Sequence, residues 1–281
     1  MLKKFFKFIE DLVEHWSTDN ISTFSAALAY YTLFALAPFI IICTALAGLV
    51  FGADAAQGQI LTDVTQLIGQ EATHQIQTMI ASAKTPVNGL LTELISFVIF
   101  LFGASGVFSQ IQLGLNHIWG VKADEKTGVI KLIKNKFLSF TLVLSLAFLS
   151  LVSLVINVLL SLMSHYVNSV VPEGIFLAWA LNFLLSLGII TLLFAMIFKI
   201  LPDVELTWSE VRLSAFITAL LFTFGKFLLG QYLQTRHLDN AFGPAGSLII
   251  ILIWVYYSAQ ILFIGAELCK MHRSKQRKKM A

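Results

Sequence analysis

Long apolar runs dominate the pattern of hydrophobic and polar positions along this chain. Residues 21–53 contain no Asp, Glu, Lys, Arg or His. At about 1.5 Å per residue this run is longer than a hydrocarbon core of about 30 Å requires. Because barrel strands would alternate over about ten residues, such unbroken runs predict membrane-spanning helices. Six segments are long enough to cross a bilayer: residues 23–51, 90–113, 137–163, 174–198, 213–233 and 245–268.

The first of these spans carries a helix-breaking residue. Pro38 has no backbone N–H, so the carbonyl of Phe34 loses its helical hydrogen-bond donor. We therefore expect a helix kink at Pro38, and the turn from Tyr30 to Pro38 to lie beside the polar faces of the bundle.

Two further segments are amphipathic instead of uniformly apolar. In residues 1–20 the apolar positions recur at helical spacing with lysines off the stripe, which predicts a cytoplasmic helix lying in the membrane interface. Residues 53–89 keep the same spacing and predict an extracytoplasmic amphipathic segment. It either packs on the outer leaflet or the bundle, or caps an outward-facing cavity, and the sequence leaves both readings open.

Composition and charge then fix the class and the orientation. The 281 residues are 57% hydrophobic and 12% charged, with a mean hydropathy of +0.82, which indicates an integral membrane protein. Sixteen Lys and Arg residues fall on one side of the predicted spans and only Lys84 and Arg236 on the other. The positive-inside rule thus predicts a single polytopic domain over residues 1–281 with both termini cytoplasmic. The basic tail, residues 270–281, is expected to contact anionic lipid.

Polar side chains inside the spans are costly in hydrocarbon and are expected to face the bundle interior or water. Lys226 shares a helix face with Ala215 and Ala219, small residues that let a neighbouring helix approach closely. It is either part of a structural ion pair, a lysine that reaches the outer interface, or part of a substrate or ion site. Glu93, at a similar depth, is the nearest candidate carboxylate.

Other polar positions align on individual helix faces. Tyr256, Gln260 and Glu267 fall within an arc of about 40° on the last span. Such faces either pack helices together or converge into a hydrophilic seam of the kind that transport requires. The candidate intramembrane polar site is the set Lys226, Glu93, Asn157, Asn182, Tyr256, Gln260 and Glu267.

Sequence motifs for catalysis or cofactor binding are not found. The six histidines are scattered, and no phosphate-binding, dinucleotide-binding or nucleophile-elbow motif occurs. Cys43 and Cys269 lie at different predicted depths, so no disulfide is expected. We therefore expect no catalytic residues, no metal, no cofactor and no nucleic-acid partner.

Three stretches resemble a known family. Residues 22–38, residues 242–267 and the segment Leu115-Asn-His-Ile-Trp119 are similar to the YihY/BrkB family of bacterial inner-membrane proteins. The resemblance implies an all-α bundle of six transmembrane helices. It implies little chemistry, because the family's biochemical role is not established. Its members have carried the label ribonuclease BN, yet this chain offers no arrangement of acids, bases or metal ligands suited to a nuclease.

These observations favour a transporter or flippase-like permease for an envelope-related or amphipathic substrate. The alternative is a structural or scaffolding membrane protein whose polar faces only hold helices together. A membrane-bound ribonuclease is the least favoured reading, and we expect that the protein is not an enzyme.

Overall fold

The computed structural model describes residues 2–51, 106–121, 174–235 and 246–280, together with a few isolated residues between 58 and 78. Every regular element in these ranges is an α-helix, which confirms the expected all-α class. The helices are α1 (Leu2–Thr18), α2 (Ile21–Phe51), a helix of residues 106–118, α7 (Gly174–Ile200), α8 (Trp208–Thr235) and α10 (Gly246–Met280).

Three of the described helices contain stretches long and apolar enough to cross a membrane. These stretches are Phe183–Ile200 in α7, Trp208–Leu229 in α8 and Leu248–Ser274 in α10. A shorter apolar stretch, Ile21–Leu36, lies in α2. They correspond to four of the six expected spans, because α2 covers the first and α7, α8 and α10 cover the last three. The expected third span, most of the second and nearly all of residues 53–89 lie outside the described residues.

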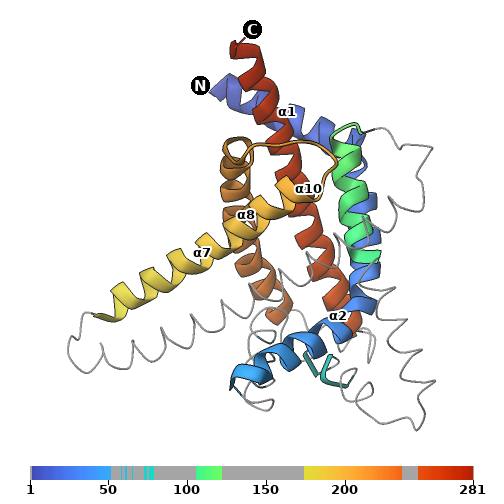
Figure 1. Ribbon diagram of the computed structural model, residues 1–281, viewed down its shortest axis with the longest axis vertical. Helices are drawn as coiled ribbons and strands as arrows, with labels where there is room; N and C mark the ends of the chain where they lie inside the picture. Colours follow the sequence, from blue (N-terminus) through green and yellow to red (C-terminus); the bar gives the residue numbers. More distant parts are fainter. Residues whose placement is uncertain are drawn as a thin grey trace.

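The two chain termini lie at the same end of the molecule (Figure 1), where α1 packs against α10. This is the arrangement expected if both termini are on one side of the membrane. Which side that is stays a prediction from the charge distribution.

Helix α2 extends from Ile21 to Phe51 but is not straight. In Figure 1 its first part runs beside α10 and its lighter blue second part turns away at a marked angle. The side chain of Pro38 lies outside the described residues, so the assignment of this bend to Pro38 stays a prediction.

A two-residue turn joins α1 to α2. Asn20 adopts the left-handed conformation, with φ 50°, which Asn tolerates better than most residues. Its carbonyl accepts hydrogen bonds from the N–H groups of Thr23 and Phe24, and thus begins α2. The N–H of Asp19 bonds to the carbonyl of His15 and closes the end of α1. The turn therefore fixes Asp19 at the junction of the two helices.

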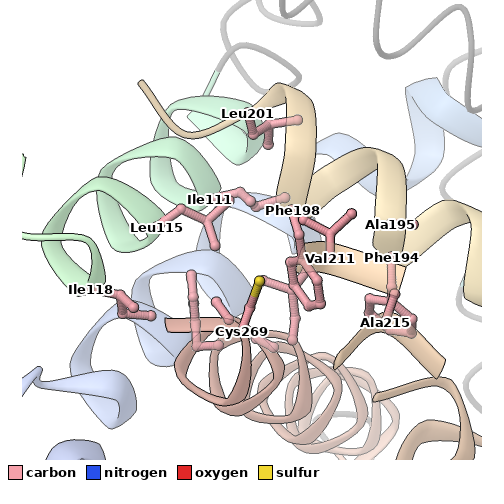
Figure 2. Close-up of a cluster of buried hydrophobic side chains, with 14 of the residues drawn as sticks. Ile111, Leu115, Ile118, Phe194, Ala195, Phe198, Leu201, Val211, Ala215 and Cys269 are labelled. Carbon is pink, nitrogen blue, oxygen red and sulfur yellow. The ribbon is translucent and has the colours of Figure 1, made fainter. Parts of the chain in front are cut away.

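The hydrophobic core lies where α2, the helix of residues 106–118, α7, α8 and α10 meet (Figure 2). Leu115, Phe198, Val211 and Phe263 are buried to 1% exposure or less. Large side chains on the outer faces of α7 and α8, such as Leu184 and Phe227, stay exposed. That distribution is typical of helices whose outer faces contact lipid, because apolar tails replace water there.

Glycines bring the helices of this core close together. A Cβ added at Gly114 would meet the ring of Phe263, and one at Gly225 would meet Tyr257. At Gly265 an added Cβ would collide with Thr218 and Phe198. At each of these glycines, a side chain of a neighbouring helix occupies the space that a side chain of the glycine position would fill. Small residues allow the same close approach in membrane helix pairs.

Candidate functional site: a charge cluster where α1 meets α10

Glu267 is the only charged residue among the described ones that is fully buried, with 0% of its side chain exposed. It lies on α10, near the end where α10 meets α1. Its Oε1 atom accepts a hydrogen bond from Lys270 Nζ, one helical turn later, at 3.4 Å. Its Oε2 atom is buried and receives no hydrogen bond within the described part of the chain. A buried carboxylate oxygen without a donor is energetically unfavourable.

Asp19 supplies a second carboxylate at the same place. Lys270 Nζ donates to Asp19 Oδ2 at 3.0 Å, and the carboxyl groups of Asp19 and Glu267 are also in hydrogen-bonding contact. Burial acts to raise the pKa of Asp19. Hydrogen bonds with Glu267 and Lys270, and the charges of Lys270 and His117, outweigh burial and hold that pKa below its ordinary value. Asp19 therefore stays ionised.

His15 completes the cluster from α1. It precedes Asp19 by four residues, so both side chains leave the same face of the helix end. One ligand atom each from His15, Asp19 and Glu267 lie within 4.8 Å of one another. We refer to His15, Asp19, Glu267 and Lys270 as the charge cluster.

A second ion pair lies one turn further along α10. Arg273 Nε is 3.0 Å from Glu210 Oε1 of α8, without a directed hydrogen bond between them. Arg273 Nη2 donates to the carbonyl of Glu205 at 3.1 Å, and its guanidinium lies over the ring of Trp119 at 5.6 Å. Arg273 thus ties α10 to the start of α8 and to the end of the helix of residues 106–118.

Glu210 has a further role at the start of α8. Its Oε2 atom accepts hydrogen bonds from the backbone N–H of Thr207 at 2.7 Å and from the Thr207 hydroxyl at 2.9 Å. This is the reciprocal bond of a capping box, which the spacing Thr-x-x-Glu allows. The cap holds Glu210 in position for Arg273.

The segment Leu115-Asn-His-Ile-Trp119 forms contacts around the same end of the bundle. Asn116 Nδ2 donates to Asp203 Oδ2 at 2.9 Å, and the backbone N–H of Asp203 donates to Asn116 Oδ1 at 2.8 Å. The ring of His117 lies 5.2 Å from that of Phe24. Leu115 and Ile118 belong to the core. This motif therefore anchors the loop after α7 and the start of α2.

The backbone explains how this motif ends. Gly120 has a φ of +66°, and its N–H bonds to the carbonyl of His117 while the N–H of Val121 bonds to that of Asn116. This pair of bonds is a Schellman motif, for which glycine is the preferred residue.

Only one member of the predicted intramembrane site, Glu267, lies in the charge cluster. Tyr256 and Gln260 are half-buried on α10, about 16 Å and about 10 Å away along the helix. Lys226 is exposed on α8, about 24 Å along that helix from Glu210. The structure therefore separates Lys226 from Glu267.

The remaining members of that site cannot be compared with one another. Asn182 lies in α7, but its side chain falls outside the described residues, as do Glu93 and Asn157 entirely. Their convergence on one polar seam stays a prediction.

The sequence did not point to Asp19, Lys270 or His15. Their signals were the spacings His-x-x-x-Asp at the end of the first amphipathic helix and Glu-x-x-Lys at the end of the last span. Charged residues at such positions are usually solvated, and nothing in the pattern distinguishes these from the others.

The fold and the cluster define a helical membrane protein whose first and last described helices are joined by a partly buried charge cluster. The chain belongs to the family described as "Virulence factor BrkB", which matches residues 12–281. This confirms the resemblance seen in the sequence.

Curated relatives agree with that assignment. A ribonuclease-like protein of Bacillus subtilis (strain 168), YfkH, is 25% identical over 96% of this chain and 96% of its own length. A UPF0761 membrane protein of Actinobacillus pleuropneumoniae is 25% identical over 92% of this chain and 90% of its own. A UPF0761 membrane protein of Pseudomonas aeruginosa is 24% identical, and this chain covers 64% of its length. No solved structure matches the chain.

Proposed function

We propose that this protein is a transporter or flippase-like permease of the inner membrane that moves an amphipathic, envelope-related substrate. One observation carries the proposal: Glu267, an ionisable group with 0% exposure, lies near one end of the apolar stretch Leu248–Ser274 of α10. Such groups are expensive in or near hydrocarbon and commonly mark substrate, ion or proton pathways.

The partners of Glu267 suggest how it would act. Lys270 bridges Asp19 and Glu267 and thereby holds α10 against the junction of α1 and α2. A cationic headgroup or a proton that reached Glu267 would compete with Lys270 and loosen this contact. A transport cycle needs such a two-state element, biased by the ligand.

A lipid-translocation assay tests the proposal. The purified protein is reconstituted into liposomes with a fluorescent phospholipid, and a membrane-impermeant reductant removes the signal of the outer leaflet only. We expect wild-type protein to expose inner-leaflet lipid to the reductant. Glu267→Gln should slow translocation by at least about tenfold, the effect of losing about 1.5 kcal/mol of charge-assisted interaction.

Glu14→Gln is the matched control, because Glu14 is an exposed carboxylate on α1 one residue from His15. It should translocate at the wild-type rate. If liposomes with wild-type protein translocate lipid no faster than protein-free liposomes, for both anionic and zwitterionic lipid probes, the proposal is contradicted. That result would favour the scaffolding alternative.

The ribonuclease reading remains the least favoured function. The name of the Bacillus subtilis relative describes that protein as ribonuclease-like. We expect the purified chain, freed of soluble contaminants, to leave RNA intact with either Mg²⁺ or Zn²⁺. Cleavage that copurifies with the protein and disappears in a variant of the charge cluster would make it an enzyme instead.

The features of the two terminal segments support the lipid surface itself as a partner. Phe6, Ile9 and Val13 form an exposed apolar stripe on α1, with 66%, 40% and 58% of each residue exposed. The basic tail, residues 270–281, continues α10 from its contact with α1, and α10 ends at Met280. An apolar stripe beside clustered Lys and Arg suits the headgroup region of an anionic leaflet.

A further inference from the structure

The charge cluster contains more acceptor atoms than donors. Asp19 and Glu267 bring two carboxyl groups into contact, while Lys270 reaches Asp19 Oδ2 and Glu267 Oε1. Glu267 Oε2 is left buried and without a donor among the described residues. Two carboxylates this close need a proton or a further cation between them.

The neighbouring atoms favour a metal ion as that cation. We propose that His15, Asp19 and Glu267 bind a divalent transition-metal ion of the zinc type, in exchange with the ammonium group of Lys270. The ligand atoms of the three residues lie within 4.8 Å of one another. Two atoms bound to one zinc ion at about 2.1 Å are at most about 4.2 Å apart. Small side-chain rotations would therefore bring all three onto one ion.

The ligand types decide which metal the site would take. One imidazole with two carboxylates suits zinc and similar transition metals, whereas Mg²⁺ and Ca²⁺ prefer oxygen ligands alone. Three protein ligands would leave the fourth zinc position to water.

Lys270 is the competitor that such an ion must displace. Its side chain is 33% exposed, whereas Glu267 is 0% exposed, so the ammonium can move out to solvent while the carboxylate cannot. One divalent ion neutralises both carboxylates, which a single ammonium cannot do. The ion would also join three segments: α1, the turn before α2, and α10 (Figure 1).

Zinc titration of the purified full-length protein tests the site. The protein is stripped with a chelator in detergent, and Zn²⁺ is added in competition with a zinc-binding dye, with thermal unfolding followed in parallel. We expect one equivalent of zinc per chain and a higher unfolding temperature in its presence. Loss of an outer-shell partner alone costs about 10- to 100-fold in affinity. His15→Ala and Glu267→Gln should each cost at least that much.

Two further variants distinguish binding at this site from zinc adsorbed elsewhere on the protein. Glu14→Gln should keep wild-type affinity, since Glu14 is exposed and outside the cluster. Lys270→Met should tighten binding because it removes the competing charge, although it breaks the ion pair. Zinc binding that survives both His15→Ala and Glu267→Gln, weaker binding in Lys270→Met, or no binding to wild-type protein would each overturn the proposal. His15→Ala and Glu267→Gln are first shown to remain helical and monodisperse, so that lost binding is not lost folding.

Discussion

Lys270 Nζ lies 3.0 Å from Asp19 Oδ2, and this ion pair joins residues 251 positions apart in the sequence. One partner belongs to the turn between α1 and α2, and the other to the C-terminal part of α10. The first and last described helices are therefore held together by a charged contact in addition to their packing.

Removing the charge of Asp19 should weaken this junction. Asp19→Asn keeps the shape of the side chain but loses the charge-assisted bond to Lys270, whose net contribution is about 1.5–3 kcal/mol. We expect a lower unfolding temperature in detergent, measured by loss of helical circular dichroism in the presence of a chelator. Glu14→Gln removes a charge from exposed surface of α1 and should leave the unfolding temperature unchanged. Equal stability of Asp19→Asn and wild type would show that the ion pair contributes nothing.

Gly225 should be intolerant of any side chain. Its Cβ position is occupied by the phenol of Tyr257 from α10, so Gly225→Ala must push the two helices apart or move that ring. Overpacking of this kind costs about 1–3 kcal/mol. Gly188→Ala is the control, because nothing lies within 4 Å of its Cβ position and alanine favours helix. Thermal unfolding should show a loss for the first and no loss for the second. If Tyr257→Ala fails to rescue Gly225→Ala, the collision is not the cause.

Exchanging the residues at positions 116 and 203 with each other should destabilise the protein less than changing Asn116 alone. Asn116→Asp places a carboxylate against that of Asp203 and replaces an attractive bond by repulsion, with an expected cost of about 1 kcal/mol at this exposed site. Asp203→Asn in the same chain restores a donor opposite the new carboxylate. The double variant should therefore be more stable than Asn116→Asp alone in chemical or thermal unfolding. Additive losses in the double variant would exclude direct coupling between the two side chains.

The orientation predicted from charge can be tested by cysteine labelling in cells. After replacement of Cys43 and Cys269, single cysteines are introduced by Gln75→Cys, Asn168→Cys, Asn240→Cys and Ser274→Cys. The positive-inside rule predicts that an impermeant reagent added from outside the inner membrane labels the first three and not the fourth. Labelling of Ser274→Cys alone would reverse the orientation.

Much of the fold could be predicted from the sequence because hydrophobic length is a local property. A charge-free run such as residues 21–53, or the apolar stretches of α7, α8 and α10, requires a helix wherever a bilayer is present. The ends of the helices were predicted less accurately than their existence. The second span was predicted to end at Leu113, and the helix that carries this position continues to Ile118, where the Schellman motif at Gly120 ends it.

The candidate site could be predicted only in part. Glu267 was singled out because it aligns with Tyr256 and Gln260 on one face of the last span, and it is buried in the structure, as are the small packing residues Ala215 and Ala219. For Lys226 the sequence left an ion pair, the outer interface and a substrate or ion site open; its side chain is exposed, although Ala219 on the same face is buried. Helical periodicity gives the direction of a side chain, but not how far along the helix a neighbour continues to cover it.

The sequence by itself determined that this is a helical membrane protein. Composition and run length set the free energy of inserting each segment into a bilayer, and they do so for each segment separately. The tertiary structure alone decided that Asp19, Lys270 and His15 gather around Glu267. A charge at a helix end is stable in water or against a partner, and only the packing of α1 against α10 selects the partner.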